Sequence, residues 1–255
     1  MVILWLGSWP AQAGVLADRV AHFPQWEKKP VVSAVVGDDL VYPTWMAGTW
    51  NVTSTLVEMT APWAPKLRTP GFAGNREYLE KPIQFRVRFH PQSQLEPVNF
   101  LDLTALFPFK QKSGNTEDKI VADREFNGLN IGKAMLGEDV ILKVQVDPRD
   151  INRQTTELTD GRELVSVVTQ RGSEIPREGE FIATEITQQV FRGQNQIYFN
   201  EVETTTVYQL KMEEGRHIVG DQMTAIYLSP QDPQYFIASG RPVALYRYQL
   251  ELWPG

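Results

Sequence analysis

The segment Pro82–His90, PIQFRVRFH, alternates apolar and polar side chains over its whole length. Apolar residues hold every second position from Ile83 to Phe89, and the positions between them hold glutamine, arginine and histidine. Successive side chains of a β-strand point to opposite faces of the sheet. The segment therefore predicts a strand with one buried face and one face in water, as antiparallel sheets commonly have.

The same alternation continues outward in both directions along the chain. Gly48–Met59 precedes the quoted segment and places Trp50, Val52 and Leu56 on one face. Further strands are predicted after it, at Val98–Phe107, Lys119–Glu125, Val140–Val146, Arg162–Arg171, Phe181–Arg192, Ile197–Met212, Ile218–Leu228 and Val243–Leu252. Short turns separate the later strands, which is typical of an up-and-down meander. Only Asn127–Gly137 carries a clear helix pattern, with Asn127 as its cap, and we expect this helix to plug or cover the barrel.

These patterns predict an all-β fold, a single closed antiparallel up-and-down β-barrel of about 8–10 strands with one short helix. Closure is expected because a long meander with one apolar face is left with unpaired edges until its ends meet. The chain has 255 residues, which suits one all-β domain. We place a lead-in segment at residues 14–41 and the barrel domain at residues 42–255.

The composition narrows the possible functions. The chain contains no cysteine, which excludes disulfides, thiol catalysis and iron–sulfur clusters. Its formal net charge of −6 disfavours nucleic acid as a partner, because an acidic surface repels phosphates. No metal-binding motif is found in the sequence, and no cofactor is indicated.

Residues 1–13, MVILWLGSWPAQA, are interpreted as the remnant of a signal peptide. A short apolar run is followed by Ala11-Gln12-Ala13, the small-residue pattern of a signal-peptidase site. The run is too short for a transmembrane helix, which needs about 20 apolar residues. Export is therefore expected, and the alternative is a buried N-terminal strand.

Gly48-x-Trp50 follows the turn-forming Tyr42-Pro43 and opens the first long strand. This arrangement resembles the first signature of the lipocalins and other calycins. The resemblance implies that Trp50 plugs the closed end of the barrel and that an arginine near the last strand packs across it. Arg247 is the first candidate for that arginine, and Arg241 is the second.

Four stretches together resemble an uncharacterised protein family of cyanobacteria and plastids. They are YPTWMAGTWNVTSTLVE (Tyr42–Glu58), TPGF (Thr69–Phe72), FNGLNIGKAMLG (Phe126–Gly137) and YRYQLEL (Tyr246–Leu252). The resemblance implies a place in the thylakoid lumen or the periplasm and a link to photosynthesis. It implies no activity.

No catalytic set is found, so an enzyme is the least favoured function. Glu201 and Glu203 share one face of a strand, but their neighbours predict that this face is solvated. Acid–base catalysis would need both carboxylates in a cleft.

The long connection between residues 60 and 81 carries large apolar side chains among prolines and glycines. Connections of this length in a compact domain are usually functional or disordered. Its apolar residues, Trp63, Leu67, Phe72 and Tyr78, could form a lid over the barrel, dock a partner, or fold back onto the barrel's side.

Two main functions remain open. The first is binding of a small apolar ligand (a pigment, quinone or lipid) inside the barrel, because a barrel of this size can hold one such ligand. The predicted lining residues are Val52, Leu56, Phe85, Val87, Leu142, Val144, Ile182, Ile186, Val202, Tyr208, Tyr246 and Tyr248. The second is a non-enzymatic interaction or assembly factor for a photosynthetic membrane complex, with its barrel filled by its own side chains. A barrel enzyme acting on a pigment is a third, weaker possibility.

Overall fold

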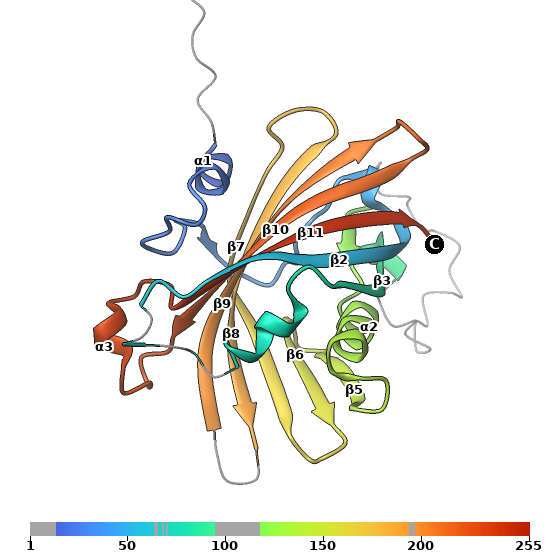
Figure 1. Cartoon of the computed structure of the whole chain (residues 1–255). Coiled ribbons are helices and arrows are strands. Elements are labelled where there is room, and N and C mark those ends of the chain that lie inside the picture. Colours follow the sequence, from blue (N-terminus) through green and yellow to red (C-terminus); the bar gives the residue numbers. More distant parts are fainter. Residues whose placement is uncertain (1–13, 64–65, 68, 70, 95–117, 194–196) are drawn as a thin grey trace, which may run out of the picture.

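The computed structural model describes residues 14–63, 66–67, 69, 71–94, 118–193 and 197–255 (Figure 1). Antiparallel strands form one strongly curled 11-stranded sheet in the order β4-β3-β2-β11-β10-β9-β8-β7-β6-β5, and β1 pairs with β7 off this path. The strands are β1 (Ser33–Ala34), β2 (Gly48–Thr60), β3 (Pro82–Pro91), β4 (Ile120–Ala122), β5 (Ile141–Asp147), β6 (Asp150–Leu158), β7 (Glu163–Glu174), β8 (Glu180–Arg192), β9 (Ile197–Lys211), β10 (His217–Leu228) and β11 (Ala244–Pro254). The helices are α1 (Val15–Ala21), α2 (Arg124–Leu136) and α3 (Tyr235–Ala238), with short 3-10 turns η1 (Thr44–Met46), η2 (Gly74–Tyr78) and η3 (Gln92–Gln94).

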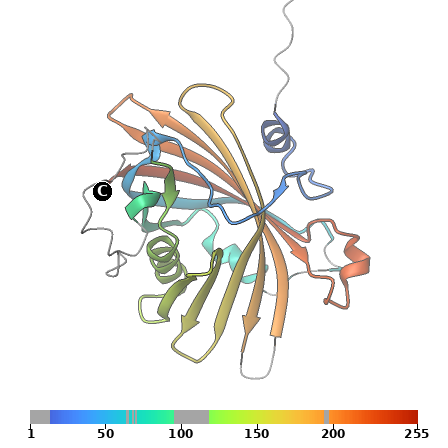
Figure 2. The ribbon, with the colours of Figure 1, turned by 180° about the vertical axis from the view of Figure 1, so that it is seen from behind.

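The predicted antiparallel meander is confirmed, but the prediction that it closes into a barrel is wrong. The sheet curls into a half-barrel, and among the described residues no strand pairing joins its β4 end to its β5 end. Helix α2 lies in the gap between β3 and β5 (Figures 1 and 2). The barrel is open because a helix, and not a further strand pair, occupies the seam.

Side chains of α2 satisfy backbone groups on both sides of this seam. The Asn127 side chain accepts a hydrogen bond from the Arg88 amide of β3 at 2.7 Å and donates one to the Arg88 carbonyl at 3.1 Å. On the other side, the Glu125 carboxylate accepts a hydrogen bond from the Val146 amide of β5 at 2.8 Å. Exposed sheet edges carry unpaired backbone groups, and α2 therefore replaces part of the missing ladder.

Two glycines let α2 approach the sheet closely. A Cβ atom added at Gly128 would lie 3.0 Å from the Val144 side chain, and one at Gly132 would lie 3.2 Å from that of Ile141. Both distances are tighter than ordinary van der Waals contact, so larger residues would push the helix away from β5.

Several element boundaries differ from the prediction. The expected strand Lys119–Glu125 is shorter in the structure, where it is β4, because α2 already begins at Arg124. Asp123 caps this helix and accepts a hydrogen bond from the Phe126 amide at 3.0 Å. Strand β6 was not predicted from the sequence. The expected strand Val98–Phe107 falls within residues 95–117, which lie outside the described residues. The proposed signal remnant, residues 1–13, also lies outside them.

Trp50 lies at one end of the half-barrel and is 1% exposed. Its indole nitrogen donates a hydrogen bond to the Met46 carbonyl of η1 at 2.8 Å. The guanidinium over its ring is that of Arg216, 5.3 Å from the ring centroid, and not that of Arg247 or Arg241. Arg247 points to the outer face and pairs with Asp221 at 2.6 Å, because strand alternation places it opposite the inward-facing Tyr246 and Tyr248. Arg241 stacks on Trp63 instead.

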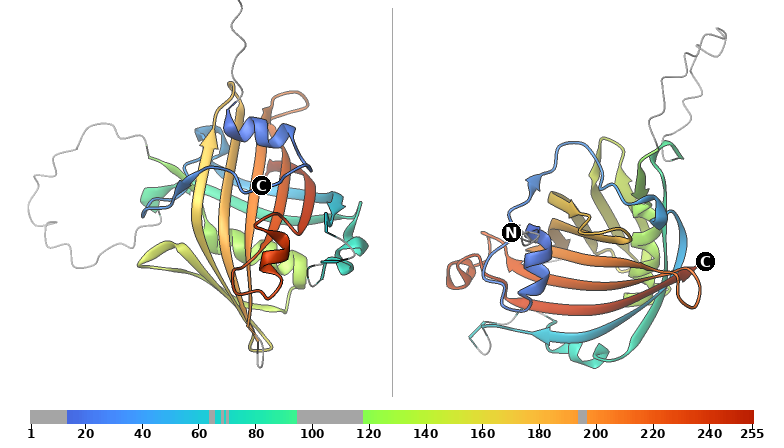
Figure 3. Two further views of the ribbon diagram at one scale, coloured as in Figure 1. Left: turned by 90° about the vertical axis from the view of Figure 1, so that its left-hand side faces the viewer. Right: turned by 90° about the horizontal axis from the view of Figure 1, so that it is seen from above.

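The N-terminal segment, residues 14–34, covers part of the outer face of the sheet (Figure 3). Trp26 packs in a cluster with Met223, Tyr227 and Leu245, which project outward from β10 and β11. Arg19 pairs with Glu203 of β9, whose side chain is fully buried, and Tyr227 donates a hydrogen bond to the same carboxylate at 2.8 Å. The half-barrel is therefore buried on both faces in this region.

Candidate functional site

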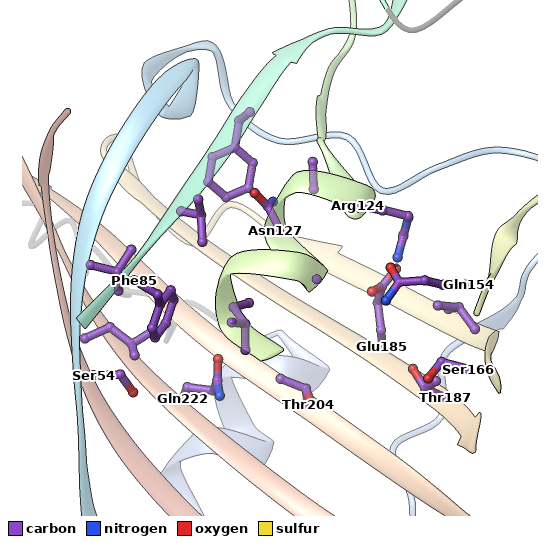
Figure 4. A pocket seen from close by; sticks show the side chains of 18 of the residues that line it. Ser54, Phe85, Arg124, Asn127, Gln154, Ser166, Glu185, Thr187, Thr204 and Gln222 are labelled. Carbon is purple, nitrogen blue, oxygen red and sulfur yellow. Dashed lines mark hydrogen bonds and ion pairs between the residues drawn. The ribbon is translucent and has the colours of Figure 1, made fainter. Parts of the chain in front are cut away.

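A cavity of about 520 Å³ lies between the inner face of the sheet and α2 (Figure 4). Cavities that bind small molecules usually measure about 300–1,000 Å³. Residues of β2, β3, β6–β11 and α2 line it, so the sheet's curl and the seating of the helix together create the space. Among its lining residues are Val52, Ser54, Phe85, Val87, Arg124, Ile131, Met135, Gln154, Ser166, Glu185, Thr187, Gln189, Thr204, Tyr208, Gln222, Tyr248 and Leu250.

The two sides of the cavity differ in chemistry. The side formed by β2, β3, β11 and α2 is mainly apolar, with Val52, Phe85, Leu250, Ile131 and Met135. The side formed by β6–β10 is mainly polar and uncharged, and its lining residues include Gln154, Ser166, Thr187, Gln189, Thr204 and Gln222. Figure 4 shows Ser166 and Thr187 on one flank, with Thr204 and Gln222 lying across the strands below α2.

The charged lining residues, Arg124 and Glu185, belong to an ionic network at the N-terminus of α2. The Arg124 guanidinium lies 2.5 Å from the Asp39 carboxylate and 2.9 Å from that of Glu185. Arg171 contacts the same two carboxylates, at 2.9 Å from Glu185 and 3.7 Å from Asp39. Asn152 accepts a further hydrogen bond from Arg171 at 2.6 Å. Two guanidinium groups therefore share two carboxylates.

The network keeps Arg124 charged. Burial by itself lowers the pKa of Arg124, but the carboxylates of Glu185 and Asp39 outweigh this effect and hold that pKa above its ordinary value. The network links α2 to β7 and β8 and to the segment before β2, so it fixes the helix over the cavity.

Buried tyrosines complete the wall of the cavity. Burial raises the pKa of Tyr208 to about 12 and that of Tyr248 to about 12. Burial also raises the pKa of Tyr42, which packs its ring against Phe181 at 5.6 Å between centroids. All three phenols are therefore neutral near pH 7 and can serve as hydrogen-bonding groups on aromatic walls.

The structure places only some of the predicted lining residues at the cavity. Val52, Phe85, Val87, Tyr208 and Tyr248 line the cavity. Leu56 and Tyr246 lie beyond one end of it, packed with Phe72, and Val202 is not among the lining residues. Val144 is buried beneath Gly128 of α2.

Leu142, Ile182 and Ile186 do not line the cavity. A register shift between Ile141 and Lys143 turns Leu142 outward, where it is 62% exposed. Ile182 and Ile186 are buried, but on the outer face of β8, because the cavity-facing residues of that strand are Glu185, Thr187 and Gln189. The assumption that the apolar face of β8 points inward was wrong, since the N-terminal segment covers its outer face.

The polar lining residues of β7, β8 and β10 were not predicted for the same reason. In β8 the sequence shows Glu185, Thr187 and Gln189 at every second position, and this alternation was the available signal. Alternation separates the two faces of a strand but does not say which one faces inward when both are covered. The expectation that Glu203 is solvated is likewise wrong, because it is 0% exposed beneath Arg19.

The residues of the long connection fold onto the half-barrel. Phe72 packs against Tyr246, with 5.8 Å between ring centroids, and Leu67 packs against Leu228 and Val243. Both are buried, and Trp63 lies beneath the Arg241 guanidinium. Tyr78 of η2 is 36% exposed and borders a small pocket next to the main cavity, which shares Ser54, Met135 and Tyr248 with it.

Within the part of the chain that the structure describes, no helix is long and apolar enough to cross a membrane. The same residues contain no group of three or more histidine, aspartate or glutamate side chains placed to hold a metal ion.

Comparison with known proteins gives one match. The model of a family described as Domain of unknown function (DUF6816) matches residues 34–254, which include every strand from β2 to β11 and helix α2. No curated protein and no solved structure matches the chain.

Proposed function

The chain belongs to the DUF6816 family, and we propose that it binds one small, largely apolar ligand in the cavity between the sheet and α2. The observation that carries this proposal is the pocket volume of about 520 Å³, which lies within the range of about 300–1,000 Å³ usual for small-molecule sites. A space of this size, with aromatic walls and convergent polar groups, is typical of ligand sites.

The ends of the half-barrel support the same proposal. Trp50 and Met46 close one end, where both are fully buried. Phe72 and Leu67 of the long connection pack over the other end, which is the position of a lid. The buried Trp50 under an arginine also supports a relation to lipocalin-like barrels, in which α2 would stand in for the closing strands.

The resemblance to a cyanobacterial and plastid family supports a pigment, a quinone or a lipid as the class of ligand. It also supports export to the thylakoid lumen or periplasm, with residues 1–13 as part of the export signal. These assignments are part of the proposal and rest on the sequence patterns described above.

The first test is to purify the protein from the organism that makes it and to analyse an organic extract by mass spectrometry. We expect one small molecule in stoichiometric amount. An empty protein that copurifies with a membrane complex would contradict the proposal and favour an interaction factor instead. The exposed Phe236 and Ile237 of α3, at 84% and 54% exposure, are the observation that favours this second function.

Two neighbouring residues of β2 provide a matched pair of variants. Ser54 faces the cavity, whereas Thr53 pairs with Glu251 on the opposite face of the sheet. Ser54→Phe should fill the cavity and abolish ligand retention, and Thr53→Phe should leave it unchanged. Thr204→Phe fills the cavity from the opposite wall and serves if the first variant does not fold. A folded filling variant that keeps its ligand would contradict the proposed site.

A further inference from the structure

The polar side of the cavity offers hydrogen-bonding groups that are not used within the fold. Ser166, Thr187 and Thr204 direct their hydroxyl groups into the cavity, and Ser54 adds a hydroxyl group from the opposite wall (Figure 4). No hydrogen bond joins these four groups to one another. Gln222 has only a long contact of 3.5 Å to Thr206. A polar group in such a site gains a partner when the ligand brings a matching donor or acceptor.

The charges around the cavity are already neutralised by one another. Each carboxylate of Glu185 and Asp39 contacts both Arg124 and Arg171. An anionic ligand would find no guanidinium without a carboxylate beside it, and a cationic ligand would find no carboxylate without a guanidinium. Bringing an unpaired charge into such a cavity costs far more than bringing in a hydrogen-bonded neutral group.

We propose that the ligand is uncharged and two-sided, with an apolar body against β2, β3, β11 and α2 and hydroxyl, carbonyl or amide groups against β6–β10. This inference rests on the proposed binding function and specifies its ligand class. The neutral amide and hydroxyl side chains of the polar side recognise such groups by donating and accepting hydrogen bonds. Fatty-acid anions and alkylammonium ions are excluded as preferred ligands.

The test compares three probes that share an alkyl chain and differ in charge. Protein freed of bound molecules is titrated with 1-decanoylglycerol, with decanoate and with decylammonium, below the concentrations at which they aggregate. We expect the neutral ester to bind at least about tenfold more tightly than either ion, which corresponds to the net value of one or two hydrogen bonds. Equal or tighter binding of an ion overturns the inference and leaves the cavity a binding site. A protein that binds none of the probes and carries no ligand from its host overturns both proposals.

Variants of the polar side sharpen the test. Thr187→Val and Thr204→Val remove the hydroxyl groups at nearly constant shape, and each should weaken 1-decanoylglycerol binding by about two- to tenfold without affecting decanoate. Thr53→Val, on the outer face, is the matched control and should change neither affinity.

Glu185→Gln removes one carboxylate from the network and leaves two guanidinium groups facing one. This variant should bind decanoate more tightly than the unmodified protein does, which reverses the preference for a neutral ligand. If its decanoate affinity does not rise while the variant stays folded, the argument from charge balance is wrong.

Discussion

Among the described residues of the half-barrel, Glu203 on the outer face of β9 is the most deeply buried charged residue. Arg19 supplies its charge partner, and Tyr227 and Thr205 donate hydrogen bonds to it at 2.8 and 3.0 Å. Removing one partner of such a pair leaves a buried charge uncompensated, which typically costs about 3–5 kcal/mol. Arg19→Met should therefore lower the free energy of unfolding by about that amount in urea denaturation.

Two further variants control this prediction. In the double variant Arg19→Met, Glu203→Gln no charge is left unpaired, and most of the lost stability should return. Arg162 and Asp160 form an exposed pair, and Arg162→Met should cost less than about 1 kcal/mol. If Arg19→Met costs no more than Arg162→Met, the buried pair does not hold the N-terminal segment in place.

At the scale of single elements, α2 depends on Asp123, which caps it and also binds β3. Burial by itself raises the pKa of Asp123, but hydrogen bonds from the Phe126 amide and Arg88, with the nearby charge of Arg88, outweigh it and lower that pKa. A carboxyl whose folded pKa is lowered stabilises the protein above its unfolded pKa of about 3.9, and this stability is lost as pH falls through the folded pKa.

Asp123→Asn should therefore destabilise the protein by about 1 kcal/mol or more at pH 7, since it weakens the cap and the pair with Arg88. The difference from the unmodified protein should begin to shrink below about pH 5 and continue to fall toward pH 3. Urea denaturation of both proteins across this range measures it. A difference that does not change with pH would show that the Asp123 charge does not support α2.

The sequence predicted those elements well whose inward face is apolar. The alternation of β2 and β3 predicted their buried face correctly, and Val52, Phe85 and Val87 lie in the cavity wall. Strands β7–β10, whose inward faces are largely polar, were also predicted, but for β8 the wrong face was assigned to the inside. Strand β6 presents Asn152 and Gln154 to the cavity and was missed because it has no apolar stripe. The polar face that hid β6 is part of the wall of the candidate site.

At the scale of the whole molecule, contacts between distant segments determine whether the sheet closes and which of its faces are covered. The periodicity of single strands predicts neither. The meander predicted strand order but not its ends, because Asn127 and Glu125 of α2 take hydrogen bonds at the seam that a strand pair would otherwise make. The N-terminal segment likewise covers part of the outer face, where Ile186 and Glu203 are almost fully buried, so residues on that face are not necessarily exposed. Alternation describes one strand at a time, whereas closure and coverage depend on which segments meet.

The N-terminal segment should therefore be essential to the stability of the molecule even though most of it precedes the matched family region, residues 34–254. Deleting residues 1–34 would expose Met223, Tyr227 and Leu245 and leave Glu203 without Arg19. Each buried apolar side chain contributes about 1.5–3 kcal/mol, so the combined loss approaches the 5–15 kcal/mol that stabilises a typical domain. We expect the 35–255 chain to aggregate or to lose its cooperative thermal transition in circular dichroism. The 14–255 chain, which keeps α1 and Arg19, is the control and should unfold as the full chain does. A 35–255 chain that stays monomeric and melts at the temperature of this control would show that the half-barrel does not need its outer cover.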